Sequence, residues 1–239
     1  MNILGPGTDR IAPADEAAEE AIVERIFEAV VEQRLPPGTK LSESDLCKAF
    51  GVGRMRIRRS LLLLASREVV ELHSNRGAFV ARPTAEQARE VFEARLAIEP
   101  NVARLAVGRA TAADIDGLQR HIDAEHGAHD LGHRHDAIRL SGQFHVRLAQ
   151  IAGNAVLLRT IKDLVTRTSL ILGLYGAPGV ASCRDDDHQT IRDAFTRRDP
   201  DLAARLMTDH LVHIQKHLDL SRTGTVGVDL VSLFAGGAA

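Results

Sequence analysis

Three histidines in this 239-residue chain have a spacing that would let them share one metal ion. His145 falls in the middle of an expected helix, His188 opens a later helix, and His210 lies in the last long helix. Three imidazoles that converge from three helices suit Zn²⁺ or Ni²⁺ and leave coordination positions open. Buried, hydrogen-bonded histidines would fit the same spacing, and His213 and His217 share a helix face with His210. Both interpretations stay open at this point.

A second group of reactive side chains is a run of basic residues within a chain of formal net charge −2. Between Leu46 and Arg82 there are eight Lys or Arg residues and only two acidic ones. Four of the eight begin one expected helix: Arg54, Arg56, Arg58 and Arg59. Arginine pairs in a forked geometry with guanine edges and with phosphates. The segment therefore has the electrostatic pattern of a nucleic-acid contact.

The elements around these arginines predict a winged helix-turn-helix over residues 15–83. Helices are expected over about 15–35, 42–50 and 54–66, and Ser42 with Asp45 forms a capping box. Two β-like pieces, 69–73 and 78–81, flank a connection rich in turn formers. In this arrangement the first turn of the third helix enters the major groove. The competing interpretation is a solvated basic face that binds a partner protein.

The remainder of the chain predicts a mainly α protein with an all-helical second domain over 84–220. Helices are expected over about 112–127, 134–151, 154–174, 186–198 and 200–220, and Pro100 is expected to kink or split the helix before them. Residues 1–14 are expected to be disordered. Residues 221–239, rich in Gly and Ala, are expected to form a flexible tail.

Composition excludes several classes of protein. No stretch approaches the roughly 18 apolar residues that a membrane span needs, and the N-terminus has no secretory pattern. Two cysteines are too few for a disulfide framework or a cysteine-based zinc site. These features favour a cytoplasmic protein without a membrane partner.

Three strings resemble the N-terminal domain of GntR-family repressors: LPPGTKLSE at 35–43, FGVGR at 50–54 and NRGAFV at 75–80. The resemblance implies that Arg54 and Arg58 contact DNA. Arg56 and Arg59 replace the family's usual Pro and Glu, so a typical family operator is not expected. The implied DNA-binding set is Ser44, Arg54, Arg56, Arg58, Asn75, Arg76 and Gly77.

The second domain resembles the FCD effector-binding domain of the FadR subfamily. The matching pieces are FEARLAIEP at 92–100, FH at 144–145, AGN at 152–154 and the segment from His188 to His210. Both resemblances together cover about residues 15–220. They imply an antiparallel helical bundle and a homodimer that binds a palindromic double-stranded operator.

The FCD resemblance also implies a metal site and an effector. Many FCD domains hold a divalent metal with one Asp and three His, and the metal grips a carboxylate. His145, His188 and His210 match the histidines, but Ser141 stands where the Asp is expected. The substitution predicts weaker metal binding, a more positive site that takes an anionic effector as its fourth ligand, or a metal-free pocket.

Two further residues are implied to bind the effector, and each has a second interpretation. Arg95 matches an arginine that the family places near the effector, yet it could instead pair with Glu99 one turn away. Asn154 faces the pocket or caps the helix that follows it.

The sequence thus predicts a transcription regulator, a repressor released from its operator by a small organic acid. The main alternative is a three-histidine metal hydrolase with a non-functional DNA-binding domain. A further alternative is a protein-binding adaptor that uses the basic face.

Overall fold

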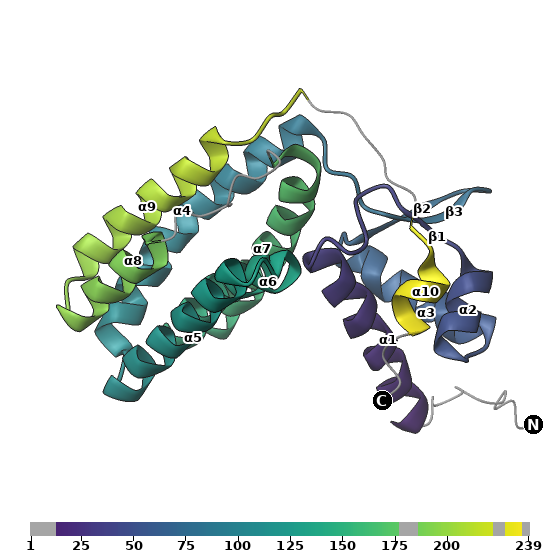
Figure 1. Cartoon of the computed structure of the whole chain (residues 1–239), viewed down its shortest axis with the longest axis horizontal. Coiled ribbons are helices and arrows are strands. Elements are labelled where there is room, and N and C mark those ends of the chain that lie inside the picture. The colour runs from purple at the N-terminus through teal and green to yellow at the C-terminus, as the bar shows by residue number, and fades with distance from the viewer. Residues whose placement is uncertain (1–12, 177–185, 222–227, 236–239) are drawn as a thin grey trace, which may run out of the picture.

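An N-terminal lobe of three helices and a small sheet carries the basic segment. A computed structural model describes residues 13–176, 186–221 and 228–235 (Figure 1). The lobe comprises α1 (Pro13–Val31), β1 (Lys40–Leu41), α2 (Glu43–Phe50), α3 (Arg54–Ser66), β2 (Val70–His73) and β3 (Gly77–Val80). The expected order of helix, helix, turn, helix and hairpin is confirmed.

Local signals define the helix-turn-helix. The Ser42 hydroxyl accepts a hydrogen bond from the Asp45 amide and caps α2, and Gly51 ends α2 with a φ of 66°. Both signals were visible in the sequence. Strand β1 was not predicted, because two residues cannot display an alternating pattern. Its Lys40 and Leu41 pair antiparallel with β3, which gives the sheet order β1-β3-β2.

Six helices form the second lobe: α4 (Ala85–Arg109), α5 (Ala112–Asp130), α6 (Arg134–Ile151), α7 (Ala155–Tyr175), α8 (Asp187–Thr196) and α9 (Pro200–Lys216). Capping boxes at Thr84 and Thr111 open α4 and α5, and Asp199 caps α9. Helix α4 packs along α9, α5 along α6, and α6 against α7. Figure 1 shows this lobe as an elongated bundle beside the N-terminal lobe.

The sequence predicts that Pro100 kinks or splits the first long helix, and the structure shows that it does not split it. Helix α4 runs from Ala85 to Arg109 with Pro100 inside it, and Pro100 is buried. A proline in a helix interior costs about 3 kcal/mol. Phe92 before it and Val102 and Ala106 after it are all buried in the bundle, and this packing holds both halves of the helix in place.

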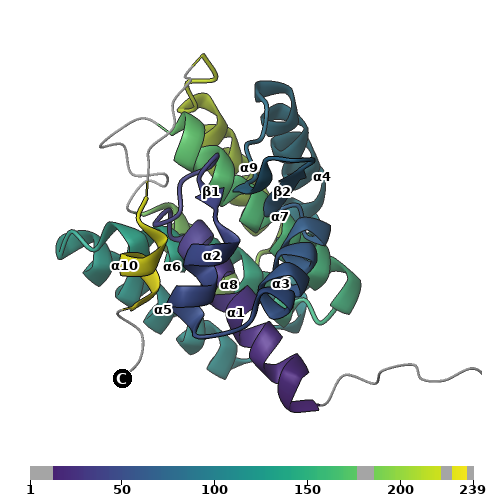
Figure 2. The ribbon, with the colours of Figure 1, turned by 90° about the vertical axis from the view of Figure 1, so that its right-hand side faces the viewer.

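The segment predicted as a flexible tail contains a helix. Helix α10 (Leu230–Ala235) packs against α2 of the N-terminal lobe, and Figure 2 shows α10 and α3 on either side of α2. Leu230 and Phe234 are buried in the core of that lobe. The residues at 1–12, 222–227 and 236–239 lie outside the described structure. Of the N-terminal segment expected to be disordered, residues 13 and 14 begin α1.

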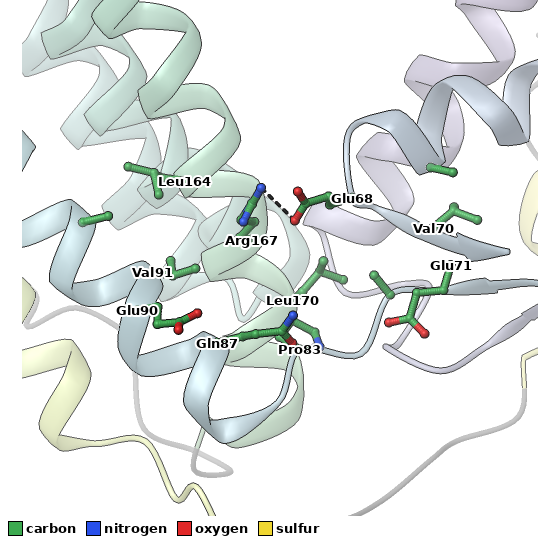
Figure 3. A pocket seen from close by; sticks show the side chains of 13 residues that line it. Glu68, Val70, Glu71, Pro83, Gln87, Glu90, Val91, Leu164, Arg167 and Leu170 are labelled. Carbon is green, nitrogen blue, oxygen red and sulfur yellow. Dashed lines mark ion pairs between the residues drawn. The ribbon is translucent and has the colours of Figure 1, made fainter. Parts of the chain in front are cut away.

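The two lobes meet along the end of α1 and the middle of α7. Glu32 pairs with Arg139 at 3.3 Å. A Cβ added at Gly173 would lie 3.2 Å from Pro37 Cδ, so a glycine is needed for this close approach. Beside the linker, a cavity of about 370 Å³ separates the lobes, and the Arg167–Glu68 ion pair spans it at 2.7 Å (Figure 3). Helices α6 and α7 are therefore the elements of the bundle that make these contacts with the N-terminal lobe.

Candidate metal centre and nucleic-acid interface

The three predicted histidines converge in the helical lobe. His145 of α6, His188 of α8 and His210 of α9 are each at most 3% exposed. One ring nitrogen from each lies within 4.8 Å of the other two. The Phe144 ring stacks on His188 with centroids 4.1 Å apart and fixes that imidazole. His210 faces inward, while His213 and His217 stack on one another outside the cluster, so His210 is the inward member of that helix face.

A carboxylate orients each of the three imidazoles through Nδ1. His145 Nδ1 lies 2.6 Å from Glu99, His188 Nδ1 lies 2.8 Å from Glu125, and His210 Nδ1 lies 3.1 Å from Asp187. An ionised carboxylate only accepts hydrogen bonds, so each Nδ1 carries the proton. The Nε2 lone pairs then remain available for a shared ligand. Carboxylates behind ligating histidines are the usual supporting groups of metal sites.

The spacing of two Nε2 atoms fits a bound cation. The Nε2 atoms of His145 and His210 are 3.4 Å apart. Ligand nitrogens about 2.0–2.1 Å from a tetrahedral metal ion lie roughly 3.3 Å from one another. Two unprotonated nitrogens at this distance repel unless a positive charge lies between them. The three imidazoles therefore fit a divalent ion that prefers nitrogen ligands.

Burial keeps the imidazole of His145 neutral. Burial lowers the pKa of His145 to about 3, although the nearby Glu99 carboxylate acts to raise it. Burial alone would raise the pKa of Glu99, but the Arg95 charge and the contact with His145 hold it well below its usual range. Burial alone would raise the pKa of Glu125, but the hydrogen bond from His188 and the attraction of His188 and His121 together lower it. The carboxylates are therefore ionised while His145 is neutral.

The charges of the supporting groups also favour a cation. Glu99, Glu125 and Asp187 together contribute three negative charges, and Arg95 contributes one positive charge. With neutral imidazoles the buried cluster has a net charge of −2, which a divalent ion would balance. The sequence predicted a more positive site because Ser141 replaces the Asp ligand. That prediction did not take account of the charges of these three carboxylates.

Arg95 forms the ion pair with Glu99 that was one of its two expected roles, and it keeps one donor unused. Its Nε pairs with Glu99, and its Nη1 donates to the Thr168 hydroxyl at 3.1 Å. Arg95 is 2% exposed, and its Nη2 has no hydrogen-bond partner in the described part of the chain. An unpaired guanidinium nitrogen is costly to bury. Arg95 is thus both a structural ion pair and a source of one unused donor.

That guanidinium borders a small cavity beside the histidines. The cavity has a volume of about 20 Å³, and its polar lining includes Arg95, Ser141, His145 and Thr168. A space of this size accommodates little more than one water molecule. Ser141 therefore lies in the predicted pocket, one helical turn before His145. No carboxylate among the described residues joins the three histidines as a ligand.

Asn154 does not line this cavity. Its side chain is exposed and accepts hydrogen bonds from the Val156 and Leu157 amides, so it caps α7. The capping interpretation therefore accounts for this residue. His121 of α5 is 4% exposed and contacts the Leu140 carbonyl at 2.8 Å.

Sequence reasoning missed the carboxylates behind the histidines. Glu99 was considered only as a partner of Arg95, and Glu125 was not considered. Asp187 precedes His188 in the sequence, yet it contacts His210. The only local signal was an acidic residue next to a candidate ligand, which is too common to identify a site.

The basic face of α3 is open to solvent. Arg54 is exposed in the first turn, Met55 is 63% exposed, and Ile57 and Leu61 are buried in the lobe core. Arg58 is exposed, and its Nε donates to Glu43 of α2 at 2.8 Å. Arg56 is half-buried. The predicted helix face is therefore available to a partner, with Arg58 held from behind by Glu43.

Part of the positive charge counted in the sequence is neutralised by α1. Arg59 pairs with the buried Glu19 at 3.3 Å, and Arg67 lies 3.5 Å from both Glu20 and Glu24. These two arginines hold α3 against α1. The charge that faces solvent is therefore concentrated at the start of α3.

The wing presents the remaining predicted residues. Asn75 and Gly77 adopt positive φ angles of 64° and 94° in the turn between β2 and β3. Arg76 at this turn is exposed, and its Nη2 contacts His73 Nδ1 at 3.2 Å. Ser44 is exposed in the first turn of α2. The predicted set thus lies on α2, α3 and the wing.

A winged helix-turn-helix joined to a helical lobe with a buried ligand centre defines a class of DNA-binding transcription regulators. The model described as "Bacterial regulatory proteins, gntR family" matches residues 18–80, and the FCD domain model matches residues 90–213. The chain belongs to the GntR family and carries an FCD domain. No helix among the described residues is long and apolar enough to cross a membrane.

Relatives support this assignment over most of the chain. The HTH-type transcriptional repressor RspR of Escherichia coli K12 is 30% identical over 190 residues, which cover 78% of this chain and 82% of RspR. The Glc operon transcriptional activator of the same strain is 27% identical, covering 83% and 88% of the two chains. The solved structure of E. coli McbR/YncC has a TM-score of 0.73 at 20% identity, covering 84% of this chain and 95% of that one. RspR and the Glc operon activator are transcription regulators, so the hydrolase alternative finds no support.

Proposed function

We propose that this regulator is a metal-containing repressor whose operator complex is released by a small carboxylate. Two copies would bind a palindromic operator in the cytoplasm through α3 and the wing. His145, His188 and His210 would hold Zn²⁺ or Ni²⁺. The observation that carries the proposal is the 3.4 Å separation of the His145 and His210 Nε2 atoms, with a carboxylate behind each ring.

The effector is inferred from the groups that surround the small cavity. The buried Nη2 of Arg95 offers an unused donor, and the Ser141 and Thr168 hydroxyls lie around the same space. A bound metal would supply an open coordination position for a carboxylate oxygen. Arg95 would hold the second oxygen through a charge-assisted hydrogen bond.

Release of DNA is inferred from the small size of the cavity. At about 20 Å³ it cannot hold an organic acid unless α6 or α7 shifts. Helix α7 lines the cavity with Thr168 and touches the N-terminal lobe with neighbouring residues: Gln33 Nε2 donates to the Ser169 carbonyl at 3.5 Å. An effector that displaces α7 would thus alter the position of the DNA-binding lobe. It shifts the equilibrium only by its difference in affinity for the two arrangements.

Elemental analysis of the purified protein, prepared without a histidine tag, tests the metal site. We expect about one Zn or Ni per chain, and loss of the metal in His145→Ala. The matched control is His217→Ala, which removes an exposed histidine outside the cluster. A wild-type protein that stays metal-free after incubation with Zn²⁺ and Ni²⁺ would contradict the metal proposal.

Gel shifts on duplexes selected from a random pool test the release of DNA by a ligand. We expect paired half-sites in the selected sequences and release by a subset of small carboxylates. Arg95→Lys keeps the charge but loses the planar fork, so carboxylates should release its DNA only at higher concentration. Arg104→Lys, at an exposed position of α4, is the control. Release of wild type and Arg95→Lys at equal concentrations would remove Arg95 from the effector site.

A further inference from the structure

The C-terminal helix is part of the DNA-binding lobe, although the intervening chain belongs to the other lobe. Helix α10 lies outside both matched regions, which end at residues 80 and 213. Its Leu230 and Phe234 are 4% and 3% exposed and belong to the core that α1, α2 and α3 share. A six-residue helix has little stability of its own. Its contacts with α1 and α2 therefore hold it in place.

Specific contacts anchor the C-terminal end of the helix to the lobe, and a local cap closes its N-terminal end. The Phe234 ring lies 4.9 Å from that of Phe50 in α2, and the Arg25 guanidinium of α1 lies over both rings. Arg25 Nη2 also donates to the Phe234 carbonyl at 2.8 Å. At the other end, the Asp229 carboxylate accepts hydrogen bonds from the Val231 and Ser232 amides. The docking is therefore defined by matching polar and aromatic groups.

The docked helix leaves the DNA-binding surface free. Arg54, Arg58 and Arg76 are exposed with α10 in place. Figure 2 shows α10 on the side of α2 away from α3. The helix is therefore compatible with bound DNA and does not act by covering α3.

The chain before α10 is fixed to the helical lobe. The Asp219 amide donates to the Tyr175 carbonyl at 2.8 Å, and Leu218 and Leu220 pack on the core beside Ile214. Six residues join Ser221 to Val228. Even a fully extended chain of this length spans at most about 25 Å. The short connection therefore limits the distance between the end of α9 and the docking site on α2.

We propose that the face formed by α1 and α2 is a docking surface for the chain's own C-terminal helix, so that the chain is anchored to the helical lobe at 218–221 and to the N-terminal lobe at Leu230–Ala235 and forms a second tie between the lobes. The first tie is the linker between β3 and α4. The second begins at α9, which carries His210, and ends on α2, which supports the recognition helix. It limits how far the DNA-binding lobe can move from the helical lobe.

Hydrogen exchange of the full-length protein tests the docking. Truncation after Ser221 removes α10, and truncation after Ala235 keeps it and serves as the control. We expect exchange in α2 to be at least tenfold faster in the first variant and unchanged in the second. Exchange in α5, which belongs to the other lobe, should be equal in all three proteins. Unchanged exchange in α2 would overturn the proposal.

A milder variant covers the case in which the truncated protein fails to fold. Phe234→Ala removes the ring that contacts Phe50 and Arg25, and Ser232→Thr changes an exposed residue of the same helix but keeps the hydroxyl that contacts Asp229. Faster exchange in α2 is expected only for Phe234→Ala. Equal exchange in the two variants would contradict the docking.

An insertion distinguishes two roles of α10: restraint of the movement between the lobes, and stabilisation of the N-terminal lobe alone. Twelve Gly and Ser residues added after Gly224 would lengthen the connection without changing α10. Spin labels at Leu62→Cys and Val156→Cys, both exposed, report the distance between lobes once Cys47 and Cys183 are replaced by Ser. We expect a broader distance distribution in the lengthened protein and unchanged exchange in α2. Identical distributions would show that the connection restrains nothing.

Cross-linking distinguishes docking within one chain from docking onto a second copy. Cys47 of α2 and Leu233 of α10 pack against the same core. In a Leu233→Cys, Cys183→Ser protein, a short bismaleimide should give a cross-linked product of monomer mass. A product of dimer mass would assign the docked helix to a second copy, and the absence of a product would show that α10 does not stay on α2.

Discussion

The Nε2 atom of His145 lies 3.4 Å from the Nε2 atom of His210, and Glu99 and Asp187 hold the opposite sides of the two rings. Both carboxylates require a protonated Nδ1, so two lone pairs face one another across this gap. A buried pair of this kind is stable only with a positive charge between the rings. The predictions about the metal centre depend on this relationship.

Restoring an anionic side chain at position 141 should tighten metal binding. Ser141 is 8% exposed, lies one turn before His145 and lines the same cavity. We expect Ser141→Asp to bind Ni²⁺ at least about tenfold more tightly, equivalent to roughly 1.4 kcal/mol. Titration calorimetry on chelator-treated protein measures the change, with Gln143→Asp at an exposed position of α6 as the control. Equal affinities would show that residue 141 does not face the metal.

Removing the charge behind His188 should weaken metal binding without removing a ligand. Glu125 is buried and contacts His188 Nδ1 at 2.8 Å. We expect Glu125→Gln to lower metal affinity by about 10- to 100-fold. Asp123→Asn makes the same charge change at an exposed position of α5 and should have no effect. If both variants bind metal equally well, the carboxylate does not support the site.

Metal-free protein should lose stability as the pH falls below neutrality, and His121 should contribute to that loss. Burial lowers the pKa of His121. The hydrogen bond with the Leu140 carbonyl acts to raise this pKa, and the Arg147 charge acts to lower it further. In the unfolded chain its pKa is about 6.5. The unfolded state therefore binds the proton first, and stability falls as the pH drops from the unfolded pKa towards the folded one.

Urea unfolding of chelator-treated protein between pH 7 and pH 4 measures this dependence. The unfolding free energy of His121→Gln should decline less steeply with falling pH than that of wild type. His217→Gln removes an exposed histidine and is the control. If the unfolding free energy of His121→Gln falls with pH as steeply as that of wild type, the pKa of His121 does not differ between the folded and unfolded states.

Arg54 and Arg76 should affect DNA binding in different ways. Arg54 begins the recognition helix, so Arg54→Ala should cost about 1–3 kcal/mol on the preferred operator and reduce discrimination between sequences. Arg76 lies on the wing, so Arg76→Ala should weaken binding to all duplexes alike and reduce the salt dependence by about one phosphate contact. Gel shifts on matched and scrambled duplexes at several salt concentrations separate the two effects. Arg89→Ala, exposed in the other lobe, controls for charge. Equal losses on both duplexes for Arg54→Ala would exclude a base contact.

Most of the architecture could be predicted because its signals are local. Ser42, Thr84, Thr111 and Asp199 act as helix caps within one turn of their own positions. The periodic apolar residues of α3 and the turn residues around Asn75 act over similarly short distances. The three histidines were recognised from their places in expected helices and from a family resemblance.

The tertiary structure decided what these elements do together. Glu99 meets His145 across 46 residues of sequence and Glu125 meets His188 across 63, because packing of different helices brings them together. Helix packing likewise pairs Arg59 with Glu19. It therefore also determines which arginines form ion pairs within the lobe and which remain available to DNA.

The C-terminal helix shows the same limit. Leu230 and Phe234 lie in a short segment flanked by Gly and Ala, with no local pattern to indicate a helix. They are helical because Phe50 and Arg25, which lie about two hundred residues earlier, offer them an apolar face. Local sequence determined where helices begin and end. Burial against distant residues determined the ion pairs, the orientation of the histidines and the place of α10, because those free energies exist only once the elements have packed.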